Sequence, residues 1–174
     1  MTKILLKVSL RYGVAAGVLA FVLLIVMYYL GQHPLLISPF LDFRVLLFGI
    51  FIFFALKEFR DYFQAGELHL WQGMLGGLVV SVAATTLASG FMYLFGTLEK
   101  EFLNSYITQI TAYVKSFPKE DIDRIGKDIY ERNLKALPTT NMSALAITYF
   151  MQGIVIGFFV NIVLSVILRR QPKP

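Results

Sequence analysis

The sequence contains no cysteine. This absence excludes disulfide bonds, thiolate metal sites and a thiol nucleophile, and it leaves the redox compartment of the protein open. Charged residues are also scarce: they make up 16% of the 174 residues, whereas hydrophobic residues make up 57%. A typical soluble domain has about 25% charged residues. The composition therefore predicts an integral membrane protein, which has the lipid bilayer as a partner.

The charges that are present are basic in balance, with a net charge of +5. An excess of Lys and Arg indicates nucleic acid binding when these residues cluster on one face. Here they flank apolar runs instead, which is the pattern that orients membrane proteins. We therefore expect no nucleic acid partner.

Four apolar runs are candidates for membrane spans. The first, at 12–30, has 19 residues, and as a helix it would be about 28 Å long, against about 30 Å for the hydrocarbon core. The apolar core of a signal peptide has only about 7 to 15 residues, so we interpret this run as a retained anchor. We predict an all-α fold and a single integral membrane domain over residues 1–174. Its four spans are expected at 12–30, 39–56, 74–98 and 144–168.

The second span carries a helix start signal. Ser38 is followed by Pro39, which suits an N-cap and the first helical position. Asp42 would then lie in the first turn, where a carboxylate complements the helix dipole. Arg44 lies close enough to this end to pair with Asp42, and we interpret the pair as an interfacial anchor rather than part of a transport pathway.

The connections on either side of the second span are polar. His33 lies in the first of them, and a lone His without a second ligand nearby indicates an interfacial polar residue rather than a metal ligand. At the other end, the helical spacing of Phe59 and Tyr62 predicts that the helix continues past Leu56 into water. We expect Gly66 to break it.

Residues 99–143 form a polar insert between the third and fourth spans. Large apolar residues recur at helical spacing from Leu103 to Phe117, which predicts an amphipathic helix. This helix either continues the third span or lies flat on the bilayer surface. Pro118 and the acidic residues after it predict a second helix that ends before Pro138. The insert is therefore predicted to be an amphipathic helical hairpin.

Small residues repeat every four positions on the third and fourth spans. Residues four apart drift only about 40° around a helix, so they share one side. In lipid, small residues let two backbones approach closely, and Gly13 and Gly17 form a shorter pair of this kind on the first span. We predict that the third and fourth spans pack along their two stripes. The members are Gly73, Gly77, Ser81, Thr85 and Ser89 on the third span, and Gly153, Gly157, Asn161 and Ser165 on the fourth.

Asn161 falls near the middle of the fourth span, where an unsatisfied amide is costly. We expect it to be structural and to bond to a hydroxyl of the third span. The candidates are the hydroxyls of Ser81, Thr85 and Ser89. These hydroxyls can equally bond to carbonyl groups one turn back in their own helix.

Charge bias predicts the orientation of the chain. The N-terminus, the 57–71 loop and the C-terminus together hold eight basic and three acidic residues, whereas 99–143 holds seven of each. Loops rich in Lys and Arg stay in the cytoplasm. We therefore expect both termini in the cytoplasm and the insert on the opposite side of the membrane.

The break between the second and third runs also carries a resemblance. The charged segment 57–61, the turn at Gly66, the Gly-rich third span and the helical insert resemble an uncharacterised domain-of-unknown-function family of small four-span bacterial integral membrane proteins. The resemblance covers nearly the whole chain, and its most specific part is 55–77. Residues 68–71 depart from the alternation of aromatic, small and polar residues that is usual there. Because that family has no established activity, the resemblance implies a fold and no catalytic residues.

The sequence contains no set of residues that indicates a catalytic or ligand-binding site. It lacks a recognisable nucleophile–base pair, a His cluster or a phosphate-cradling loop, so we expect no enzyme activity, no cofactor and no metal. The leading hypothesis is a structural or accessory subunit of the bacterial inner membrane, whose outward hairpin contacts the bilayer, a membrane-protein partner or further copies of the chain. The alternative is a small oligomeric transporter or channel for a neutral or hydrophobic solute. Its path would be lined by Ser81, Thr85, Gln152 and Asn161.

Overall fold

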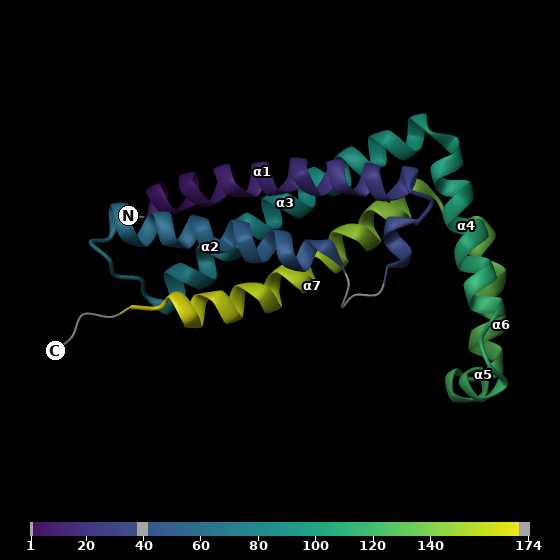
Figure 1. Cartoon of the computed structure of the whole chain (residues 1–174). Helices are drawn as coiled ribbons and strands as arrows, with labels where there is room; N and C mark the ends of the chain where they lie inside the picture. Colours follow the sequence, from purple (N-terminus) through teal and green to yellow (C-terminus); the bar gives the residue numbers. More distant parts are fainter. Residues whose placement is uncertain (1, 38–41, 171–174) are drawn as a thin grey trace.

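The computed structural model describes residues 2–37 and 42–170, and this part of the chain is helical, as predicted. Four long helices pack side by side in a bundle (Figure 1). Three shorter helices form an arm at one end of it. The bundle helices are α1 (Thr2–Tyr29), α2 (Phe43–Phe63), α3 (Leu70–Leu98) and α7 (Met142–Leu168), and the arm helices are α4 (Lys100–Lys115), α5 (Lys119–Ile125) and α6 (Lys127–Ala136). Short 3-10 helices, η1 (Pro34–Leu36) and η3 (Leu137–Thr139), lie in the connections before α2 and before α7.

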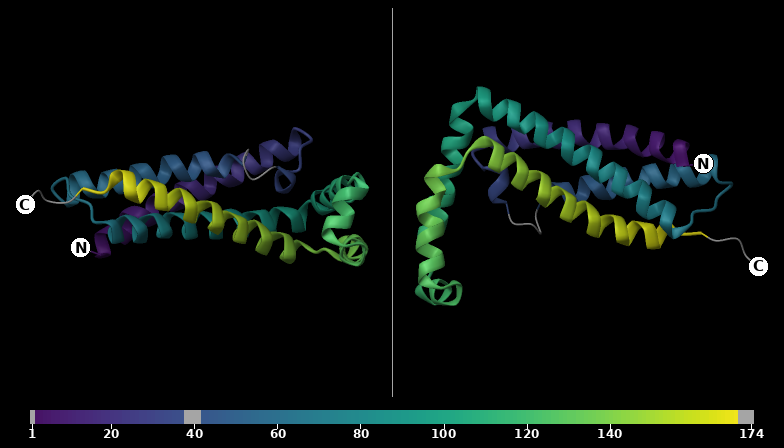
Figure 2. Two further views of the ribbon diagram at one scale, coloured as in Figure 1. Left: turned by 90° about the horizontal axis from the view of Figure 1, so that it is seen from below. Right: turned by 180° about the vertical axis from the view of Figure 1, so that it is seen from behind.

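The two ends of the bundle differ in what they carry. α1 begins and α7 ends at the same end, which we call the terminal end (Figures 1 and 2). There Leu68, between α2 and α3, exchanges two backbone hydrogen bonds of 2.9 Å with Arg170. Arg11 also donates to the Glu58 carboxylate at 2.5 Å, which ties α1 to α2. The arm leaves the opposite end, which we call the arm end.

Within the described residues, three helices are long and apolar enough to cross a membrane, namely α1, α3 and α7, with 28, 29 and 27 residues. At 1.5 Å per residue each is about 40 Å or more in length, which exceeds a hydrocarbon core of about 30 Å. α2 has 21 residues, but Arg44 and the charged segment 57–61 leave only the apolar stretch 45–56 between them, about 18 Å of helix. Length and composition therefore do not confirm the predicted span at 39–56.

α2 begins later than the sequence predicted. Its first residue is Phe43, and its N-cap is Asp42, whose carboxylate accepts a hydrogen bond of 2.9 Å from the backbone N–H of Arg44. The predicted cap, Ser38, and Pro39 lie outside the described residues. The Ser-Pro signal is a local one, whereas Asp42 also gains an ion pair with the side chain of Arg44, and this second interaction favours the later start.

The predicted extension of α2 beyond the apolar stretch is confirmed. The helix continues past Leu56 to Phe63. It ends before Ala65 and Gly66, which have φ angles of +51° and +87°. A left-handed glycine at this point is a common way to end a helix, because glycine has no Cβ to oppose positive φ.

α3 is the central helix of the bundle and packs along both α1 and α7. The small pair on the first span lies at the contact between α1 and α3. A Cβ added at Gly13 would lie 2.9 Å from the carbonyl oxygen of Val80, and one added at Gly17 would lie 2.8 Å from that of Ala84. The helix that approaches this pair therefore belongs to the same chain.

The arm runs across the axis of the bundle (Figures 1 and 2). The amphipathic helix does not run straight on from α3, because Glu99 is extended, with φ −97° and ψ 90°. Gly126, with φ +93°, divides the predicted second helix of the insert into α5 and α6. Among the residues of the three arm helices only Phe102 is buried.

Candidate functional site

The most unusual site in the bundle is a buried arginine near the start of α2. The side chain of Arg44 is only 4% exposed, and that of Asp42 is 7% exposed. Nε of Arg44 donates to both carboxylate oxygens of Asp42 at 2.9 Å, and Nη2 donates to Oδ2 at 2.5 Å. Because the two residues form a close ion pair, together they carry no net charge into the interior.

The same guanidinium binds α7. Nη1 of Arg44 donates to the backbone carbonyl of Tyr149 at 3.0 Å, and Nη2 donates to Oε1 of Gln152 at 3.1 Å. The guanidinium carbon also lies 4.2 Å from the centre of the Tyr149 ring, a cation–π distance. We call Asp42, Arg44, Tyr149 and Gln152 the Arg44 cluster. It joins the start of α2 to α7 through charge-assisted hydrogen bonds, which are stronger than bonds between neutral groups.

A groove of about 330 Å³ lies beside the Arg44 cluster. Its apolar wall is formed by Ile37, Met151, Val155 and Ile156, and its polar part by Asp42, Arg44 and Gln152. The polar groups in it are already bonded to one another, so the groove does not present a free charge. The described residues also hold no group of three or more His, Cys, Asp or Glu side chains that would bind a metal ion.

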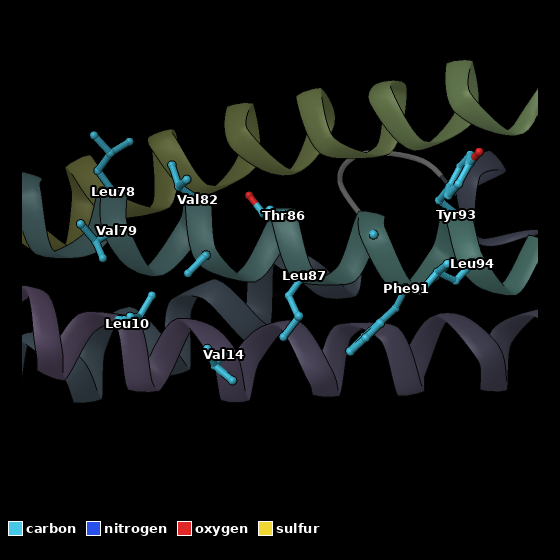
Figure 3. A pocket seen from close by; sticks show the side chains of 12 residues that line it. Leu10, Val14, Leu78, Val79, Val82, Thr86, Leu87, Phe91, Tyr93 and Leu94 are labelled. Atoms are coloured by element: carbon cyan, nitrogen blue, oxygen red, sulfur yellow. The ribbon is translucent and has the colours of Figure 1, made fainter.

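A larger groove of about 780 Å³ follows the contact between α1 and α3 (Figure 3). Its lining is almost wholly apolar and includes Leu10 and Val14 from α1 and Leu78, Leu87 and Phe91 from α3. No polar groups converge in it. The surface is of the kind that hydrocarbon chains cover, and it offers no group that orients a polar ligand.

The two predicted stripes meet at the contact of α3 with α7, in antiparallel register, from Gly73 to Thr85 on α3 and from Gly153 to Ser165 on α7. A Cβ added at Gly73 would lie 2.9 Å from Oγ of Ser165, and one added at Gly157 would lie 2.6 Å from Cβ of Ser81. The next pairs in the same register are Gly77 with Asn161 and Gly153 with Thr85. Each step of four residues along α3 is thus matched by a step of four back along α7.

Asn161 bonds to a different partner from the one expected. Its Nδ2 donates to the backbone carbonyl of Met74 at 2.8 Å, and its Oδ1 accepts from Oγ of Ser165 at 3.0 Å. A Cβ at Gly77 would overlap the Asn161 amide, so the bare glycine is what lets this side chain reach the α3 backbone. The expected hydroxyl partners bond back within α3 instead. These bonds run from Ser81 to Gly77, from Thr85 to Ser81 and from Ser89 to Thr86.

His33 is buried at the arm end, with a residue exposure of 2%. Its Nδ1 accepts from the backbone N–H of Leu35 at 3.4 Å, so Nε2 carries the proton and donates to the carbonyl of Phe102 at 3.3 Å. Its ring also packs against those of Tyr28 and Tyr106. Burial lowers the pKa of His33 to about 4, and the bond to Phe102 opposes this only in part. The neutral imidazole therefore links the α1–α2 connection to the start of α4.

The roles of two residues, Tyr149 and Asn141, were not predicted from the sequence. Tyr149 is an aromatic residue within an apolar run, and nothing in its neighbourhood distinguishes a ring that faces an arginine from one that faces lipid. Asn141 caps α7, with its Oδ1 accepting from the backbone N–H of Ala144 at 2.8 Å. An Asn just before a long apolar run is a start signal that the sequence does contain.

Comparison with known proteins identifies one family. The sequence profile described as "Protein of unknown function (DUF4199)" matches residues 11–170. This range includes nearly all of the bundle and the whole arm. No curated protein and no solved structure matches the chain at a significant level.

Proposed function

We propose that this chain, which belongs to the DUF4199 family of unknown function, is a non-enzymatic integral membrane protein that serves as a structural or accessory subunit. The observation that carries the proposal is the distribution of polar groups. Inside the bundle, the Arg44 cluster and Asn161 bond to neighbouring helices. In the arm, by contrast, no residue of α5 or α6 is buried, and the apolar side chains of Tyr113, Ile125 and Ile129 are exposed. The bundle is thus suited to anchoring the protein in the membrane, and the arm is suited to contact with a partner or the bilayer surface.

In this proposal all four bundle helices cross the membrane. α1 begins and α7 ends at the terminal end (Figure 1), so the number of crossings between these two points is even. α2 also has an apolar outer face, with Leu46, Ile50 and Phe54 exposed by 68, 42 and 49%. Its charged start is covered by α7 at Tyr149, seven residues or about 10 Å into that helix. A neutral, hydrogen-bonded pair inside the bundle is the form in which a membrane tolerates such charges.

The charge bias supports an orientation for the four spans. The basic N-terminus, the 57–71 loop and Arg170 gather at the terminal end, and the arm with its balanced charges lies at the other. By the positive-inside rule, the terminal end lies in the cytoplasm. The arm then lies on the outer side of the bacterial inner membrane.

The transporter alternative has less support from the arrangement of its polar residues. Ser81, Thr85 and Asn161 lie in the close contact of α3 with α7, where each is nearly fully buried. Gln152 lines the groove beside the Arg44 cluster, apart from these three residues. A path for solute through the bundle would require these helices to separate along their tightest contact.

Native mass spectrometry of the full-length chain in nanodiscs tests the proposal. An accessory subunit, tagged and extracted from its own membranes, should carry a second protein at fixed stoichiometry in addition to its own 19.7 kDa. A chain that purifies alone, and that by itself moves a neutral solute across liposomes, would instead establish the transporter. The matched liposome control is a Gly157→Leu variant, because a path along α3 and α7 would not survive this change.

A further inference from the structure

One face of α4 begins inside the bundle and continues beyond it. Phe102 is fully buried in the apolar cluster at the arm end, and Leu103 and Tyr106 pack against the same cluster. From Tyr106, steps of four, three and four residues lead to Ile110, Tyr113 and Phe117, within an arc of about 60° on the helix. We call the last three residues the distal face of α4.

The rest of the protein covers the distal face only in part, because Ile110 and Phe117 are half-buried whereas Tyr113 is exposed. Tyr113 is 61% exposed, and Phe117 packs on it edge to face, with 5.2 Å between the ring centres. α6 lies along a neighbouring side of α4, where the Tyr130 hydroxyl donates to the carbonyl of Val114 at 3.3 Å. In Figures 1 and 2 the arm extends past the bundle to one side, so this part of α4 has no bundle helix beneath it.

We propose that the distal face is embedded in the outer surface of the bilayer, with Ile110, Tyr113 and Phe117 at the boundary between headgroups and acyl chains. The inference rests on the proposed function, which makes the bundle axis the membrane normal. An arm that crosses this axis then lies in the plane of the membrane. Its underside is the side that packs on the bundle at Tyr106, so the distal face points into the bilayer.

The chemistry of the arm fits a lipid interface. An amphipathic helix in this position buries its apolar stripe a short way into the membrane and keeps its charges in water. Tyr and Phe suit this depth because their rings are apolar and a Tyr hydroxyl can remain hydrated. The 99–143 insert has seven acidic and seven basic residues, so its attachment does not depend on anionic lipids.

A fluorescence depth measurement tests the inference on the full-length chain. The only tryptophan, Trp71, is replaced by Phe, and a single reporter is introduced as Tyr113→Trp or, as a matched control, Lys115→Trp. Position 115 is about 200° around the same helix from Tyr113, on its exposed side. In vesicles of zwitterionic phosphatidylcholine with bromines on the upper acyl carbons, the fluorescence of Tyr113→Trp should be quenched much more strongly than that of Lys115→Trp, because an interfacial helix buries its apolar side at this depth. Lys115→Trp should instead be quenched by acrylamide from the water.

A third reporter separates failure of this inference from failure of the proposed function. Phe159→Trp replaces a ring that is 64% exposed on α7, and bromines deep in the acyl chains should quench it if the bundle spans the bilayer. If Phe159→Trp is quenched but Tyr113→Trp responds only to acrylamide, the arm stands away from the membrane and the inference is wrong. Shielding of Tyr113→Trp from both quenchers would mean that protein covers the face, which also overturns it. Absence of quenching at Phe159→Trp would refute the proposed function itself.

Discussion

The buried ion pair of α2 gives a prediction whose size follows from the structure. Asp42 has two roles: it caps α2 through the backbone N–H of Arg44, and it neutralises the Arg44 guanidinium. Asp42→Asn keeps the first role, because Asn is also a good N-cap, and removes the second. A guanidinium only 4% exposed would then be left uncompensated, and breaking a buried pair in this way costs about 3 to 5 kcal/mol.

The double variant Asp42→Asn with Arg44→Met separates charge from contact. Met restores much of the apolar volume but loses the bonds to the Tyr149 carbonyl and to Gln152. Since replacing both partners of a buried pair by groups of similar shape is often nearly neutral, we expect the double variant to be more stable than Asp42→Asn alone, by about 2 kcal/mol. The Arg44→Met single variant completes the cycle, because independent residues would give Arg44→Met the same effect on stability with and without Asp42→Asn.

Reversible unfolding in mixed detergent micelles, followed by circular dichroism, measures these differences. The control is Asp61→Asn, which removes the partner of Arg60 from a less buried pair, and we expect a much smaller change there because solvent screens exposed pairs. If Asp42→Asn were as mild as this control, water would reach Arg44 and the pair would not be buried. If the double variant were the least stable of the set, the cluster would owe its strength to hydrogen bonds and not to charge balance.

Three further predictions concern other parts of the molecule. The pKa of His33 is lowered from 6.5 to about 4, so the contact between α4 and the bundle is at full strength above pH 6.5 and weakens as the pH falls towards 4, by up to about 3 kcal/mol. Hydrogen exchange of the α4 amides should become faster over this pH range, and His33→Gln should remove the pH dependence. Gly157→Leu should destabilise the fold in thermal melts by about 1 to 3 kcal/mol, since it inserts a side chain into the α3–α7 contact. The control Val155→Leu changes an exposed position and should not destabilise the fold. Equal tolerance of both substitutions would mean that the stripe faces lipid. A cytoplasm-only reporter should be inactive after Lys119 and active after Gln64, and the reverse pattern would overturn the orientation.

The sequence predicted well those features that depend on one helix at a time. The helical class, the three long apolar helices and the extension of α2 to Phe63 all follow from periodicity, capping and composition. The packing of α3 on α7 was also predicted, because a small residue at every fourth position leaves one strip of each helix where a backbone can approach, whereas the register of the two helices was not. The structure brings Gly77 opposite Asn161 and Ser81 opposite Gly157 on these strips.

The features that the sequence did not predict depend on residues far apart in the chain. Arg44 looked like an anchor at the membrane surface, because its charge is visible in the sequence while its contact with Tyr149, 105 positions away, is not. The predicted hydrogen-bond partner of Asn161 was wrong for a related reason. A side chain that packs against a glycine can reach the backbone of the neighbouring helix. The acceptor is the backbone carbonyl of Met74, and a backbone acceptor cannot be recognised from the residue types in a sequence.

The bundle and the arm also differ in what holds them in place. The bundle buries apolar clusters at both ends, and Arg44 and Asn161 form hydrogen bonds between its helices. The arm helices bury only Phe102, and their base is held by Phe102, Leu103 and Tyr106 against the bundle and by the hydrogen bond from His33. Segments with so few buried contacts open at low free-energy cost, so the order of the arm depends on what covers its apolar face. Lipid, partner or acid acting on the arm would therefore change its conformation well before the four packed helices respond.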